Sequence, residues 1–240
     1  MRPRVPRGRL GAEGAVIVVS ILLALAVQAW WENRQERRQE AEYLLALRGE
    51  LNEGLSRLPQ VETAFAEMLH SHEALIAQFR EGDSPQPDSL VFWLSALSWP
   101  PSFSPPTAVL NDLVSSQGIQ LIESDSIRLG LGEYRVLLAR FEDAADQSWA
   151  AWAERIQPYL EGRVSRVERL RKGRYPRPVP FAPSPFVPSY DDLLRDAAFE
   201  SMIAERWTRL DVASDVLGRI RTVMTRLVTL IDAELGQGGR

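Results

Sequence analysis

The sequence has no cysteine and only two histidines among 240 residues, and these absences exclude several kinds of chemistry. Without cysteine, the chain has no disulfide framework, no thiolate metal site and no cysteine nucleophile. Two histidines cannot supply a site that requires three imidazole ligands. With a formal net charge of −4, the chain also lacks the excess of basic residues that is typical of nucleic-acid-binding proteins. We therefore expect no metal, no other cofactor and no nucleic-acid partner.

One long apolar run is present near the beginning of the chain. Residues 14–31, GAVIVVSILLALAVQAWW, contain no charged side chain. As a helix this run is about 27 Å long, close to the hydrocarbon thickness of a bilayer. Trp30 and Trp31 stand at its end, where tryptophan rings prefer the membrane interface. The pattern predicts a basic tail over 1–13 and a single transmembrane helix over 14–31, with both tryptophans as membrane-interface residues.

The same run also fits a secretory signal peptide, because it follows an arginine-rich start and contains Val27-Gln28-Ala29 as a candidate cleavage site. We favour a retained signal anchor, since the helical pattern continues through this point without a break. Arginines flank the run on both sides, so the positive-inside rule gives a near tie. We place the N-terminal tail inside and the C-terminal domain outside, because this avoids exporting the arginine-rich tail.

The rest of the sequence predicts an all-α domain over 32–235. Apolar residues recur three or four positions apart over about 32–80, 127–171 and 199–235, which is the period of amphipathic helices. We expect the first of these to continue the membrane helix as one rod, and all three to share one buried seam. The apolar positions assigned to the second helix include Leu129, Val136, Leu137, Phe141, Trp149, Trp152, Ile156 and Leu160, and those of the third include Leu210, Val212, Val216 and Ile220.

Small polar residues, prolines and glycines mark the connections in this domain. Ser104 is the predicted N-cap of a helix through 107–117, with two prolines in its first turn and Gly118 as a left-handed residue at its end. Asp125 or Ser126 is predicted to cap the next helix.

The segment YPRPVPFAPSPFVPSY at 175–190 cannot form a regular helix, because it holds several prolines. We expect an extended loop whose aromatic side chains lie against the domain surface. Together with the shorter helices it would cap one end of the bundle. Residues 236–240 are predicted to form a flexible tail.

An ordered set of motifs resembles a bacterial family of small single-pass membrane proteins whose function is unknown. An apolar anchor is followed by tryptophan, an Arg/Glu-rich stretch and Tyr43-Leu44-x-x-Leu47-x-x-Glu50-Leu51. The next match is Thr107-x-x-x-Leu110-x-x-Leu113-x-Ser115-x-x-Gly118-x-x-Leu121-Ile122, followed by Tyr134. The resemblance covers about 14–135 and implies membrane location and a helical architecture, without catalytic residues.

Two short motifs could carry chemistry, but structural roles explain both. Glu67 and His70 have the spacing of half a carboxylate-bridged di-metal site, whereas His72 points to another face of the helix. Ser115 and Ser116 are not part of a Gly-x-Ser-x-Gly elbow and fit the end of a helix. We therefore predict that the protein is not an enzyme.

One cluster of basic residues occurs in the second half of the chain. It is a candidate interaction patch for anionic lipid head groups or an acidic partner. We favour the alternative of a solvated helix end, where cations complement the helix dipole and glutamates are interspersed. The predicted patch consists of Arg163, Arg166, Arg169, Arg171, Lys172 and Arg174.

These observations predict a membrane-anchored, non-enzymatic interaction or scaffolding protein of the bacterial envelope. Its expected partners are the lipid bilayer and either another protein or a second copy of the chain. The alternative is a sensor bundle that binds a ligand in a tryptophan-lined pocket and signals through a partner. The tryptophans considered for that pocket are Trp93, Trp99, Trp149, Trp152 and Trp207, although tryptophan in a helical bundle more often belongs to the core.

Overall fold

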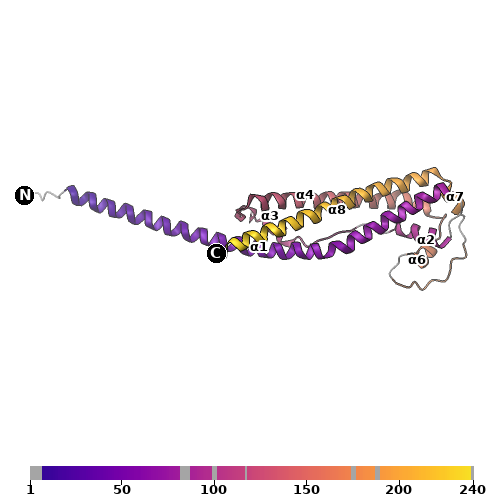
Figure 1. Ribbon diagram of the computed structural model, residues 1–240, viewed down its shortest axis with the longest axis horizontal. Coiled ribbons are helices and arrows are strands. Elements are labelled where there is room, and N and C mark those ends of the chain that lie inside the picture. The colour runs from indigo at the N-terminus through magenta and orange to yellow at the C-terminus, as the bar shows by residue number, and fades with distance from the viewer. Residues whose placement is uncertain are drawn as a thin grey trace, which may run out of the picture.

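The computed structural model describes residues 7–81, 87–98, 102–116, 118–173, 177–186 and 190–238, with side chains from residue 20 onward except at 81, 87, 237 and 238. Every regular element in these ranges is helical, which confirms the all-α prediction. Figure 1 shows an elongated bundle from which the beginning of the first helix projects. The elements are α1 (Arg7–Glu81), α2 (Pro87–Ala96), α3 (Ala108–Ser115), the 3₁₀ turn η1 (Gly118–Leu121), α4 (Asp125–Ala150), the π-helical turn η2 (Ala151–Ile156), α5 (Gln157–Leu160), α6 (Arg166–Lys172), α7 (Tyr190–Leu194) and α8 (Ala197–Gly238).

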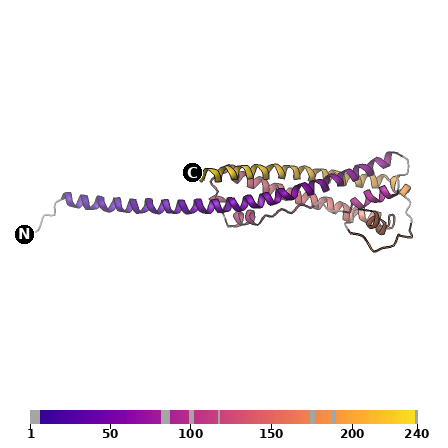
Figure 2. The same cartoon turned by 60° about the horizontal axis from the view of Figure 1, so that its bottom comes forward.

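Three long helices form the body of the bundle, with α8 packed along both α1 and α4 (Figures 1 and 2). They share one hydrophobic core, as predicted. The rings of Phe65 on α1 and Phe141 on α4 are 5.9 Å apart across this core, and Phe103 packs edge-on against Phe141. The other large core side chains of α4 are Ile127, Leu131, Tyr134 and Leu137.

The predicted core-facing positions of α4 are right in part: Leu137 and Phe141 are buried, whereas two others are not. Leu129 is 75% exposed and Val136 is 54% exposed, because the face toward α1 and α8 carries Ile127 and Leu131 instead. Leu129 is two positions along the chain from Ile127, which places it about 200° around the helix axis from Ile127, on the solvent side. Trp149 and Val212, also assigned to core-facing positions, are exposed.

A second, smaller core lies at the end of the bundle where α1 ends. Leu75 of α1, Trp152 of η2 and Phe199 of α8 meet there with α2, α6 and α7. The prediction that shorter helices cap one end is therefore correct for α2 and α7, and α6, predicted as part of a long helix, also lies there. The prediction is wrong for α3, which packs on α1 and contributes Leu110 and Leu113 to the main core.

The single helix predicted over 127–171 is interrupted. The helical path passes through η2 and α5 and ends at Leu160. Gly162 then adopts a φ of 79°, which favours glycine because it has no Cβ. Ser165 begins α6 as its N-cap, its Oγ accepting a hydrogen bond from the Glu168 N–H at 3.4 Å. The arginines expected on one helix are therefore divided between a turn and a separate short helix.

The predicted helix caps also differ from those observed. The prolines after Ser104 precede α3, whose N-cap is Thr107. Gly118 has no positive φ and begins η1 instead of ending α3 in a left-handed conformation. The cap of α4 is Ser124, whose Oγ accepts a hydrogen bond from the Ile127 N–H at 3.5 Å. Asp125, one of the two predicted caps, is already in the first turn.

The proline-rich segment is non-helical over its described part, 177–186, as predicted. Residues 175–176 and 187–189 of the prediction lie outside the described residues. Of the segment's aromatic side chains, Phe181 (49% exposed) and Phe186 (79% exposed) are not held against the domain, whereas Tyr190, already in α7, packs against the smaller core. At the other end of the sequence, α8 continues to Gly238 because Leu235 still packs against the core, so the tail predicted over 236–240 begins as helix.

Two buried glutamates of α1 hold the segment between α2 and α4. The Glu50 carboxylate accepts hydrogen bonds from the backbone N–H groups of Val109 (2.7 Å) and Leu110 (3.2 Å). These are N–H groups in the first turn of α3, which have no partner within their own helix. Ten residues earlier on α1, Glu40 accepts a hydrogen bond from the Glu123 N–H at 2.7 Å. Glu50 therefore caps α3 from a neighbouring helix.

We expect Glu50→Ala to lower the free energy of unfolding by about 2–3 kcal/mol, because two buried N–H groups lose a charged acceptor. The measurement is urea unfolding of the full chain, followed by tryptophan fluorescence. Glu53→Ala is the matched control, since Glu53 is exposed and, among the described residues, its carboxylate pairs with Arg57 alone, on the same helix. The control should change stability by less than about 0.5 kcal/mol. Equal losses in the two variants would contradict the capping role.

Candidate membrane segment and arginine-lined pocket

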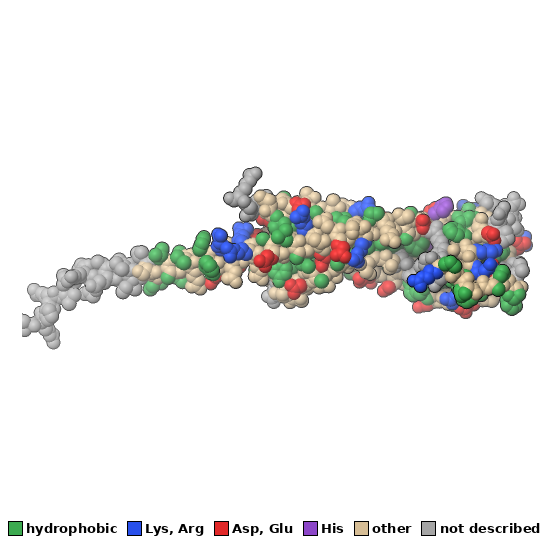
Figure 3. Space-filling model, turned by 90° about the horizontal axis from the view of Figure 1, so that it is seen from below, with side chains coloured by type: hydrophobic (Ala, Val, Ile, Leu, Met, Phe, Trp, Pro, Cys, Tyr) green, Lys and Arg blue, Asp and Glu red, His purple; other side chains and the backbone are tan. Residues whose placement is uncertain are grey.

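The first part of α1 projects from the bundle, and its side chains over 20–39 are exposed (Figures 1 and 3). Apolar side chains occur on every side of this helix, so no single face is prepared for packing against the bundle. The large ones are between 55% and 65% exposed: Ile21, Leu22, Leu23, Leu25, Val27, Trp30 and Trp31.

Over the residues that the structure describes, no helix is both long enough and apolar enough to span a membrane. The predicted membrane segment 14–31 is only partly included in them, because the side chains of 14–19 are not described. Residues 1–6 of the predicted basic tail also lie outside the described residues, and 7–13 belong to α1.

Aromatic and basic side chains follow the apolar stretch as α1 approaches the bundle. The ring centroids of Trp30 and Trp31 are 6.5 Å apart, and the Arg34 guanidinium lies 5.7 Å from the Trp30 ring. One turn further on, Arg37 forms an ion pair with Glu123 at 2.8 Å. Arg37 is thus at the position where α1 first contacts the bundle.

The predicted basic patch is divided by the fold. Arg171 and Lys172 pair with Glu168, and Lys172 also contacts Asp88 at 2.7 Å. The Ser184 N–H, which donates to Glu168 at 2.9 Å, is the main cause that lowers the pKa of this carboxyl, with Arg171 and Lys172 adding to it. This arrangement fastens the proline-rich loop to α6. Arg174, also predicted for the patch, lies outside the described residues.

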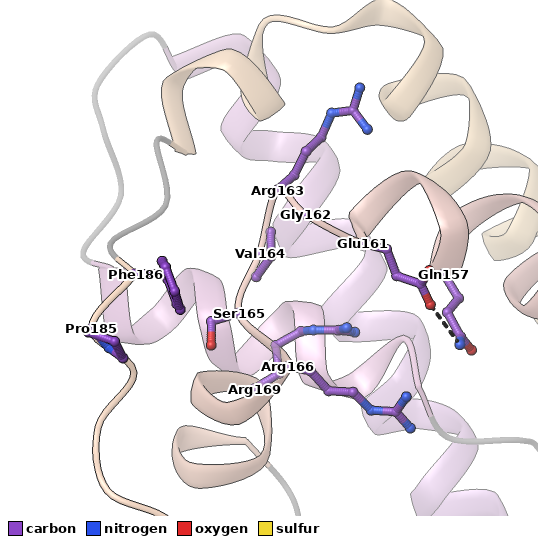
Figure 4. A pocket seen from close by; sticks show the side chains of 10 residues that line it. All are labelled: Gln157, Glu161, Gly162, Arg163, Val164, Ser165, Arg166, Arg169, Pro185 and Phe186. Atoms are coloured by element: carbon purple, nitrogen blue, oxygen red, sulfur yellow. Dashed lines mark hydrogen bonds between the residues drawn. The ribbon is translucent and has the colours of Figure 1, made fainter.

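The remaining three arginines line a cavity of about 710 Å³ at the far end of the bundle (Figure 4). The side chains of Arg166 and Arg169 extend in the same direction, whereas Arg163 turns away. Arg163 lies 4.2 Å from the Tyr159 ring centroid and donates to the Tyr159 carbonyl oxygen at 2.7 Å. The other lining residues are Gln157, Glu161, Gly162, Val164, Ser165, Pro185 and Phe186.

Beneath this cavity, one buried tryptophan contacts two guanidinium groups. Arg169 and Arg206 lie 5.7 and 5.5 Å from the ring centroid of Trp152, in η2. Arg206 is fully buried and donates to the Leu97 carbonyl oxygen, just past the end of α2, where a cation complements the helix dipole. Burial lowers the pKa of Arg206 to about 9. This cluster joins α2, α6 and α8.

The predicted tryptophan-lined pocket has no counterpart in this cavity, since none of the described tryptophans lines it. Trp152 is buried in the small core, and the half-buried Trp207 donates a hydrogen bond to Glu73 at 3.2 Å. Trp99 is outside the described residues. The sequence did identify Arg163, Arg166 and Arg169 as a basic cluster, but it contained no signal for the cavity that they line.

The other motifs considered for chemistry have structural surroundings. His70 is exposed whereas His72 is fully buried, and no three His, Asp or Glu side chains converge among the described residues. The hydroxyl groups of Ser115 and Ser116 both donate to the Asp112 carbonyl oxygen at the end of α3.

Comparisons with protein-family models, with curated proteins and with solved structures found no match. The family resemblance noted in the sequence therefore stays a prediction.

Proposed function

We propose that this protein is a membrane-anchored, non-enzymatic interaction protein of the bacterial envelope. The observation that carries the proposal is the projecting, apolar part of α1. A helix satisfies its own backbone hydrogen bonds, so it can enter the hydrocarbon region without partners. Each exposed leucine, isoleucine or valine at its centre favours insertion by about 0.3–0.6 kcal/mol. The aromatic pair Trp30 and Trp31 would lie at the interface.

The continuity of α1 supports a second part of the proposal, namely that the long axis of the bundle points away from the membrane. The same helix continues from the projecting part to Glu81 and carries the bundle along its second half. At a rise of ~1.5 Å per residue, Leu75 is about 65 Å from Trp31 along α1. The small core that contains Leu75 also contains Val164, beside the arginines. Head groups of the anchoring membrane would therefore not reach this cluster, and the far end would meet a partner.

In this proposal the chain crosses the inner membrane once, and its C-terminal domain is periplasmic. The resemblance to single-pass membrane proteins of unknown function is consistent with it. Because α8 ends beside the point where α1 enters the bundle (Figures 1 and 2), the chain returns toward the membrane.

The test is extraction and protease accessibility of the full chain in bacterial cells. We expect the protein to stay in the membrane pellet after alkaline carbonate washing, and protease added to spheroplasts to digest the bundle. Release by carbonate would contradict the anchor. Protection of the bundle in spheroplasts, with digestion only after lysis, would instead contradict the orientation.

The second candidate function is a ligand-binding bundle that signals through a partner. One observation favours it, the arginine-lined cavity at the far end of the bundle.

A further inference from the structure

The cavity at the far end of the bundle gathers positive charge without equal negative charge. Three arginines line it, and Glu161 is the only carboxylate among the lining residues. Glu161 is exposed, and one of its oxygens accepts a hydrogen bond from Gln157 at 3.3 Å. Within the described part of the chain, none of the three arginines forms an ion pair, in contrast to neighbouring Arg171.

Arg169 is the arginine for which this imbalance matters most. It is only 6% exposed, and its Nε has no hydrogen-bond partner among the described residues. Its contacts are one long hydrogen bond from Nη1 to the Ser98 Oγ at 3.4 Å and the ring of Trp152. Burial and the neighbouring Arg166 lower the pKa of Arg169, and Glu161 raises it less. A buried charge in proteins is normally paired, so an anion is the group that this site lacks.

The form of the cavity indicates what kind of anion it would hold. Its volume of about 710 Å³ lies within the range of small-molecule sites. Val164, Pro185 and Phe186 supply an apolar wall on one side, and Phe186 is 79% exposed. Figure 4 shows Phe186 on the opposite side of the cavity from the ends of the two extended arginine side chains.

We propose that this cavity binds a small organic anion, a phosphate or carboxylate joined to an apolar or aromatic group. Its anionic oxygens would accept hydrogen bonds from Arg166 and Arg169, because guanidinium groups match the geometry of both oxyanions. Its apolar part would lie toward Phe186. The proposal goes beyond the proposed function and does not depend on the membrane anchor.

The experiment is calorimetric titration of the purified full chain, in one non-ionic detergent throughout, with phenyl phosphate, benzoate and neutral phenol. We expect at least one of the two anions to bind with a Kd below about 1 mM, and phenol not to bind. Arg166→Gln should weaken binding about tenfold or more, as expected for loss of a charged hydrogen bond. Glu161→Gln should tighten binding, because it removes the competing carboxylate. Arg166 is exposed, so its replacement leaves the core unchanged.

Arg140→Gln is the matched control, since it removes the same charge from an exposed position of α4 outside the cavity, and we expect its affinity to stay within about twofold of the wild type. Stronger binding of phenyl phosphate than of benzoate, or the reverse, identifies the anion and supports the proposal. Absence of binding by both anions up to about 10 mM would overturn it. So would an equal loss of affinity in Arg166→Gln and Arg140→Gln, or equal binding of phenol.

Discussion

Replacing Leu22 and Leu25 by aspartate is expected to release the full chain from the membrane fraction. The two side chains are 60% and 57% exposed on the projecting part of α1, near the centre of the predicted segment 14–31. An aspartate at the centre of a membrane helix costs about 2.5–3.5 kcal/mol in insertion. Two of them should therefore lower partitioning into the bilayer by at least about a thousandfold. The measurement is the fraction of protein that floats with membranes in a density gradient.

The control is a second double variant, Leu129→Asp with Val136→Asp, which introduces the same two negative charges on the surface of the bundle. These side chains of α4 are 75% and 54% exposed, and they lie outside the projecting helix. We expect the control protein to float with membranes as the wild type does. Both double variants should retain the urea midpoint of the wild type, because none of the four side chains belongs to the core. Flotation of the Leu22 and Leu25 variant at wild-type level would rule out the anchor.

The long helices and their shared seam could be predicted because their apolar residues recur at helical period. Which apolar residues of α4 face the core could be predicted only in part, since Leu137 and Phe141 do so but Leu129 lies on the solvent side. The helix instead turns Gly130 toward α8. A Cβ atom at Gly130 would lie 2.7 Å from Leu227 Cδ2, so the absence of a side chain permits this close approach. A glycine in a helix does not by itself indicate which partner it faces.

The break after α5 had a local signal, because Ser165-x-x-Glu168 has the spacing of a capping box and follows Gly162. The burial of Arg169 had no such signal. It results from contacts with Trp152 and Ser98, which reach Arg169 only through the packing of η2 and α2. The cavity was therefore not predictable as a site, although its arginines were identified.

Acid is expected to destabilise the bundle through His72, a fully buried residue of α1. Its Nδ1 lies 2.7 Å from the Met68 carbonyl oxygen, so Nδ1 carries the proton of the neutral ring. Its Nε2 is buried and has no hydrogen-bond partner in the described part of the chain. A second proton there would be buried near the positive charge of Arg206. Burial and then Arg206 lower the pKa of His72 from 6.5 to about 3, although the Met68 bond acts in the opposite direction.

Because the folded pKa of His72 is below the unfolded one, its contribution to stability is complete above pH 6.5 and declines as the pH falls toward 3. The loss should reach about 2 kcal/mol at pH 5 and about 3 kcal/mol at pH 4.

Carboxylates also titrate near pH 4, so the informative quantity is the difference in the free energy of urea unfolding between the wild type and His72→Phe. Phenylalanine fills a similar volume without a titrating group. The free energy of unfolding of His72→Phe should therefore fall less than that of the wild type, by about 2 kcal/mol at pH 5 and about 3 kcal/mol at pH 4. His70→Gln, at an exposed position of the same helix, should follow the wild type throughout. If His72→Phe and the wild type lose stability in parallel between pH 7 and pH 5, protonation of His72 is not the cause of the acid sensitivity.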